Sequence, residues 1–200
     1  MRTVGTTTIA LLCLVLTAAP ARAADKQIRP FFGATFGGST TFVDLEKASG
    51  RFNPVVGVSA VWLGEMFGVE GEFADAPGFF QAGSQHLVLS SRVTTLTGNV
   101  VVAAPRRYTE YGLRPYLVGG AGMMRAHIED YFGIFKVARV LPSFDVGAGA
   151  IGFITADVGI CWEVRRFQSL GGSSEEQGLT TIGHERLSFW RASMGLAIRY

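Results

Sequence analysis

The chain has 200 residues, a formal net charge of +2, 48% hydrophobic residues and 26 glycines. Its small charge and scattered basic residues argue against a nucleic-acid-binding protein. Beyond the N-terminal region no apolar run is long enough for a transmembrane helix, so any part of the mature chain that crosses a membrane must do so as strands.

The first 23 residues have the pattern of a secretory signal peptide. Arg2 supplies positive charge, the stretch 9–18 is apolar, and Ala21-Arg22-Ala23 offers small residues at a cleavage site. The apolar stretch is about ten residues long, too short to span a bilayer as a helix. We therefore expect a cleaved signal peptide at 1–23 and a single mature domain at 24–200.

Alternation of apolar and polar residues with a period of two runs from Ile28 to the last residue and predicts strands rather than helices. Eight strands are predicted, in chain order, at 28–38, 54–63, 66–76, 88–103, 114–126, 141–152, 156–165 and 187–200. The facing of the fourth and fifth strands stays open, and in the fourth the apolar residues occur on both faces. The fifth and sixth are rich in glycine and only weakly patterned.

The third, seventh and eighth strands show which residues share a face. In the third, Glu70 and Glu72 lie on the same side. The seventh has one wholly apolar face, while the other carries Asp157, Glu163 and Arg165. The eighth repeats this alternation and ends on an aromatic residue.

The links between the strands alternate in length. The long ones are predicted at 39–53, 77–87, 127–140 and 168–186, the tight ones at 64–65 and 153–154, and an intermediate one at 105–113. An up-and-down barrel with both termini on its short-turn side has this pattern. The predicted fold class is therefore all-β: an eight-stranded antiparallel up-and-down transmembrane β-barrel preceded by a cleavable signal peptide.

Which face of the strands points out of the barrel follows from the residue types that lipid and the barrel interior each tolerate. Lipid accepts Val, Ile, Trp and Met, whereas an Arg or Lys at the bilayer midplane costs about 2–4 kcal/mol. The interior of an eight-stranded barrel holds only the side chains that fill it, and charges there must be paired. We therefore predict an outward apolar band and an inward network of carboxylates and guanidiniums, with glycines making room for the long side chains.

Two groups of residues are assigned from this facing. The predicted interior charge network consists of Glu70, Glu72, Asp145, Asp157, Glu163, Arg165, Arg191 and Arg199. An aromatic girdle at the membrane interfaces is predicted for Trp62, Phe67 and Trp190. The inverse arrangement, a soluble ligand-binding barrel with its aromatics inside, would crowd a small interior.

Three stretches carry a family resemblance: PFFGATFGG at 30–38, RPYLVGGAG at 114–122 and FWRASMGLAIRY at 189–200. Together they resemble the bacterial outer-membrane β-barrel family of the OmpA transmembrane domain and the opacity-type proteins. The resemblance covers nearly the whole mature chain. It implies location in the cell outer membrane and recognition of the aromatic C-terminal residue, here Tyr200, by the barrel-assembly machinery during biogenesis.

Other motifs give no support for a cofactor or an enzyme. The run GAGAIG at 147–152 matches a dinucleotide fingerprint, but a strand rather than a helix is predicted to follow it. His86, His127 and His184 fall in or beside different long links, and Ser84 near His86 has no carboxylate to orient the histidine. With the signal removed, Cys161 is the only cysteine, so no disulfide or thiol metal cluster is expected.

The sequence thus predicts a non-enzymatic outer-membrane barrel with a structural or surface-contact role. The main alternative is a narrow pore gated by the internal Arg/Glu network, and a lipid-modifying barrel enzyme is a further one. The expected partners are outer-membrane lipid and lipopolysaccharide, together with the assembly machinery. The barrel is expected to be a monomer with no cofactor and no nucleic acid.

Overall fold

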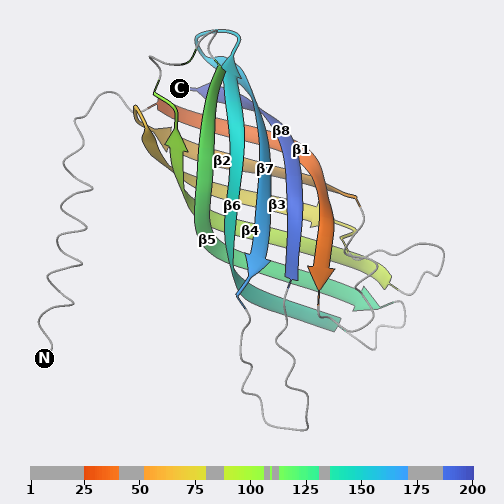
Figure 1. The fold of residues 1–200 in the computed structure, drawn as a ribbon. Helices are drawn as coiled ribbons and strands as arrows, with labels where there is room; N and C mark the ends of the chain where they lie inside the picture. Colours follow the sequence, from red (N-terminus) through yellow and green to blue (C-terminus); the bar gives the residue numbers. More distant parts are fainter. Residues whose placement is uncertain are drawn as a thin grey trace, which may run out of the picture.

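The structure is a computed structural model that describes residues 25–40, 52–79, 88–105, 109, 113–130, 136–170 and 187–200. Eight antiparallel strands form one closed barrel in chain order (Figure 1). The strands are β1 (Asp25–Thr40), β2 (Asn53–Leu63), β3 (Phe67–Pro77), β4 (Val88–Ala103), β5 (Leu113–Asp130), β6 (Lys136–Phe153), β7 (Val158–Ser169) and β8 (Leu187–Arg199). The predicted eight-stranded up-and-down barrel is confirmed, while the predicted signal peptide lies outside the described residues.

Pairing of the first strand with the last closes the sheet. Gln27 lies opposite Arg199 and Phe36 opposite Trp190 across this seam. Closure leaves no edge strand, so each strand is paired with two neighbours over most of its length. In the described ranges no helix is long and apolar enough to cross a membrane.

The two ends of the barrel differ. One end, called here the turn end, holds the tight connections 64–66 and 154–157 together with Asp25 and Tyr200. The opposite end, where β1, β3, β5 and β7 finish, is called the loop end. In the predicted orientation the turn end faces the periplasm and the loop end faces outward.

The predicted bounds of two links are wrong. The long link at 127–140 is largely strand, because β5 continues to Asp130 and β6 begins at Lys136, with Glu129 opposite Lys136. Backbone pairing extends this hairpin beyond the point where side-chain alternation can be recognised. At the other end, Ala156 does not start β7 but lies in a turn, in which the Ile154 and Thr155 amides donate to Val158 O at 3.0 and 3.1 Å.

Burial alternates along the strands and confirms the predicted facing. The outer surface exposes large apolar side chains of every strand, among them Phe32, Val58, Phe73, Leu96, Leu117, Val146, Trp162 and Met194. The open question of β4 is also settled. Its buried face carries Val93, Thr95, Thr97, Asn99 and Val101, and its outer face carries Leu96, Val100 and Val102.

The interior contains two apolar layers that the sequence patterns did not predict. Near the loop end the layer is Val55, Ala74, Ala76, Phe79, Val93, Met124, Ala126, Leu141, Phe167, Leu187 and Phe189. Near the turn end it is Val61, Leu63, Val101, Ala103, Tyr116, Val118, Ile151, Cys161 and Ala197. A layer of buried charged side chains lies between them.

Candidate functional site

The candidate site is the charged layer inside the barrel. It contains Glu70 and Glu72 of β3, Asp145 of β6, Glu163 and Arg165 of β7, and Arg191 of β8. Each of these side chains is at most 9% exposed. An isolated buried charge costs several kcal/mol, so the arrangement depends on how completely these groups pair.

Arg165 is the centre of the network. Its Nη2 donates to Glu70 Oε2 at 2.6 Å and to Glu163 Oε2 at 2.8 Å. Its Nη1 donates to Asp145 Oδ2 at 3.2 Å, and its Nε donates to Glu163 Oε1. One guanidinium therefore links the carboxylates of three strands, and β3 is the strand farthest from β7 in the closed order.

Arg191 forms the second ion pair. Its Nη1 and Nη2 donate to the two carboxylate oxygens of Glu72, both at 2.7 Å. The guanidinium carbon lies 4.7 Å from the ring centroid of Phe31 and 4.8 Å from that of Phe167. A bidentate pair held between two aromatic rings has little freedom to rotate, which makes this contact a rigid part of the interior.

Neutral side chains from two further strands complete the network. Asn99 Nδ2 of β4 donates to Glu70 Oε2 at 3.2 Å. The Tyr116 hydroxyl of β5 donates to Glu163 Oε2 at 2.9 Å. The polar layer therefore joins β3, β4, β5, β6, β7 and β8 through side chains, in addition to the backbone ladders.

Arg29 of β1 is a buried cation that the sequence analysis did not include. Its Nε donates to Gln27 Oε1 at 2.9 Å, and its guanidinium lies 5.3 Å from the ring centroid of Tyr116. Within the described part of the chain, its Nη1 and Nη2 have no hydrogen-bond partner. Arg29 lies on the same side of β1 as Phe31 and Gly33, so alternation along the strand could have identified it as an inward residue.

Glycines of β6 make room for the network, as predicted. A Cβ on Gly147 would lie 2.6 Å from Arg165 Cγ and 2.5 Å from Val164 O. A Cβ on Gly149 would lie 2.6 Å from the Tyr116 hydroxyl. The run 147–152 is thus part of a strand wall, and the next element is a turn followed by β7 rather than a helix.

Very little space remains around the charges. The cavity lined by Arg29, Ser59, Tyr116, Cys161 and the ionic cluster has a volume of about 10 Å³. This is about the smallest space that can hold a single water molecule. Because apolar layers cover the cluster on both sides, the described residues leave no room here for a continuous column of water.

Two residues assigned to the network lie elsewhere. Asp157 is exposed in the turn that precedes β7. Arg199 lies at the turn end, where its Nε pairs with Asp25 Oδ1 at 2.9 Å and its Nη1 donates to Ala156 O at 3.0 Å. Both assignments to the interior network were wrong. Asp157 precedes the first residue of β7, and alternation along β8 specifies the side on which Arg199 lies but not its height along the barrel axis.

The predicted interface aromatics all lie on the outer surface. Trp62, Phe67 and Tyr200 are exposed near the turn end. Trp190 lies toward the loop end, where the Arg166 guanidinium lies 5.4 Å from its ring centroid. The recognition of Tyr200 by the assembly machinery stays a prediction.

The histidines do not form a common site in the described residues. His127 lies on the outer face of β5, whereas His86, His184 and Ser84 fall outside the described ranges. No group of three metal-ligating side chains occurs within the part of the chain that is described.

No protein-family model matches the chain, and no curated protein matches it. Solved structures of bacterial outer-membrane barrels do match. Neisserial surface protein A (NspA) aligns with a TM-score of 0.61 at 13% identity, over 88% of this chain and 97% of that one. OprG of Pseudomonas aeruginosa aligns with a TM-score of 0.54 at 12% identity, over 89% and 96%.

Ail, the attachment invasion locus protein of Yersinia pestis, aligns with a TM-score of 0.52 at 15% identity, over 88% of this chain and 99% of that one. At these identities the likeness is one of fold. It agrees with the predicted family resemblance and with the predicted outer-membrane location.

Proposed function

From the fold of an eight-stranded outer-membrane barrel, we propose that this protein is a non-enzymatic component of the bacterial outer membrane with a structural or surface-contact role. The observation that carries the proposal is the contact of Arg165 with Glu70 across the barrel, at 2.6 Å. Together with the Arg191–Glu72 pair it fills the cross-section. A filled cross-section favours a rigid membrane body over a conduit.

The lengths of the strands support a role at the surface. β2 and β3 have 11 residues each, whereas β5 and β6 have 18 each. A tilted strand crosses the bilayer core with about 9–11 residues. The hairpin of β5 and β6 is therefore long enough to extend beyond the bilayer at the loop end, where it is accessible to partners.

Conductance in planar bilayers tests the closed interior. We expect the wild-type barrel to insert without steady conductance, and the Arg165→Ala/Arg191→Ala variant to stay closed as well, because the apolar layers on both sides of the charges remain. Steady conductance of the wild type would instead support the alternative of a narrow pore gated by the Arg/Glu network. The gel mobilities of boiled and unboiled samples show whether the wild type and the variant are folded in the preparations that are used.

The envelope role is tested in cells. A strain that lacks the protein should take up a hydrophobic dye faster than its parent, or lose adherence to a surface, and the wild-type gene should restore either property. Full complementation by a variant that does not fold would contradict a role for the barrel itself.

A further inference from the structure

Where strand side chains are described, the charged ones on the outer surface lie only near the two ends of the barrel. Among the strand residues whose side chains are described, the outward charges near the loop end are Asp75, Arg92, Arg125 and Arg166, and the one near the turn end is Lys26. The outer positions between them on β3, β4 and β5 are apolar apart from Thr94. Such residues are suited to contact with lipid acyl chains.

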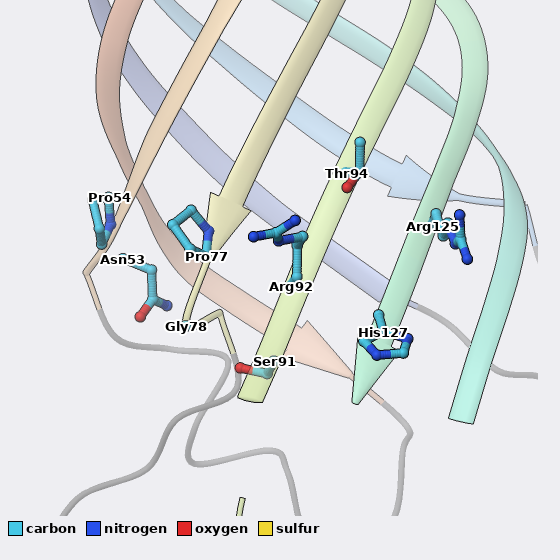
Figure 2. Close-up of a pocket in the computed structure, with 9 residues that line it drawn as sticks. All are labelled: Asn53, Pro54, Pro77, Gly78, Ser91, Arg92, Thr94, Arg125 and His127. Carbon is cyan, nitrogen blue, oxygen red and sulfur yellow. The ribbon is translucent and has the colours of Figure 1, made fainter. Parts of the chain in front are cut away.

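Two of these arginines border a hollow at the loop end. Its volume is about 850 Å³, and Figure 2 shows Arg92 and Thr94 on β4 beside Arg125 and His127 on β5. The other described residues that line it are Asn53, Pro54, Pro77, Gly78 and Ser91. Arg92 lies opposite His127 and Thr94 opposite Arg125, so the two arginines occupy diagonal positions, about 7–8 Å apart in such a ladder.

Among the side chains that the structure describes, the hollow has more positive than negative groups. Arg92 Nε lies 3.5 Å from Asp75 Oδ2, but its side chain is still 62% exposed. Asp75 Oδ1 also accepts a hydrogen bond from the Thr94 hydroxyl, at 2.9 Å. Arg125 is exposed and makes no ion pair with any described residue. The charged side chains described at the hollow are therefore two guanidiniums and one carboxylate, with a sum of +1.

The position of the hollow along the strand identifies its environment. From Arg92 to Val102, β4 advances ten residues, which is about 33 Å of strand. At a tilt of 35–45° this corresponds to about 25 Å along the barrel axis, the height of the apolar band of such barrels. Arg92 therefore lies where acyl chains give way to headgroups.

We propose that this hollow binds a phosphate group of a glycolipid in the outer leaflet, with Arg92 and Arg125 as the phosphate ligands and the apolar band below them against the acyl chains. Planar guanidiniums bind phosphate oxygens in pairs and keep their charge at all physiological pH values. The assignment rests on the outer-membrane placement in the proposed function. It names lipopolysaccharide as the partner and the hollow as its site.

Lipid binding is measured with the folded barrel in phosphatidylcholine nanodiscs. The probes are lipid A that carries both phosphates and the same lipid with its phosphates removed. Arg125→Gln is the informative variant, because among the described residues it breaks no existing contact. Arg92→Gln/Arg125→Gln removes both ligands, and Lys26→Gln at the opposite end is the matched control.

We expect wild type and Lys26→Gln to bind the phosphorylated lipid alike. Arg125→Gln should bind it at least about tenfold more weakly, and the double variant more weakly still, since charge-assisted hydrogen bonds are lost. Equal binding of the lipid without phosphates would overturn the proposal. So would unchanged affinity in the double variant, or stronger binding of inorganic phosphate or a soluble sulfated oligosaccharide than of the lipid.

The same preparations separate this proposal from the proposed function. A heat-dependent mobility shift shows that each variant is a closed barrel in the membrane. If the wild-type protein shows the heat-dependent mobility shift but does not bind lipid A, only the lipid site is refuted. If the wild-type protein does not insert into bilayers, the outer-membrane placement is refuted.

Discussion

Arg165 Nη2 on β7 donates a 2.6 Å hydrogen bond to Glu70 Oε2 on β3, the strand farthest from β7 in the closed order. This contact joins opposite walls of the barrel, which the backbone ladders connect only through the intervening strands. The buried charges are therefore part of what holds the cross-section together.

Removal of Arg165 should be strongly destabilising. In Arg165→Met, Glu70, Asp145 and Glu163 lose their shared cation, and breaking a buried ion pair from one side costs about 3–5 kcal/mol. Urea unfolding in lipid vesicles, followed by tryptophan fluorescence, measures this loss. The matched control is Arg166→Met on the outer face, which loses its stacking on Trp190 and should cost no more than about 1 kcal/mol. Equal losses in the two variants would contradict the central role of Arg165.

Arg29 should contribute much less than Arg165. Arg29→Met removes one hydrogen bond to a neutral amide and the stacking on Tyr116, for a total of about 1–2 kcal/mol. The same unfolding assay should therefore rank Arg29→Met well below Arg165→Met. The reverse order would mean that Arg29 balances the carboxylate charge more than its contacts indicate.

Substitution of Gly147 should disturb packing inside the wall. A Cβ there would lie 2.5 Å from the backbone oxygen of Val164, which cannot move without displacing β7. We expect Gly147→Ala to cost at least about 1–3 kcal/mol through overpacking. Gly98→Ala is the control, because no atom lies within 4 Å of its added Cβ. The fraction of protein that keeps the unboiled gel mobility measures both, and similar fractions would refute the packing argument.

The outer face should respond to charge according to depth. Leu96 lies near the middle of the outer face of β4 and is 52% exposed, so Leu96→Arg should cost about 2–4 kcal/mol in a bilayer. For Trp62→Arg, near the turn end, the added charge should lower the free energy of unfolding by only about 0–1 kcal/mol. Unfolding in vesicles measures the difference. An equal cost at both positions would contradict a lipid-facing band.

The number of strands, their order and the side facing outward could all be predicted from the sequence. These properties depend on local alternation, which is visible in runs such as 158–165. The inward position of Glu70, Glu72 and Arg165 follows from the same alternation, and the need of a narrow interior for paired charges predicts a network of some kind.

The identity of the partners could not be predicted in this way. Alternation places Asp157 and Arg199 on the inner side, yet Asp157 lies in an exposed turn and Arg199 pairs with Asp25 at the turn end. The pairing of a given cation with a given carboxylate depends on how far neighbouring strands are shifted relative to one another. This shift is a property of the whole closed barrel. The apolar layers on either side of the charges arise in the same way, since they gather residues from distant strands at one height.

The outer surface shows the same division. The sequence by itself determined that β3 presents Phe67, Val69 and Phe73 to lipid, because alternation along that strand is sufficient, whereas the facing of β4 and β5 was decided by their place in the closed sheet. Only the tertiary structure decided that Arg92, Arg125 and His127 border one hollow, because their proximity depends on the register between β4 and β5. A period of two specifies a face, whereas a site requires neighbouring strands to be aligned at the same height.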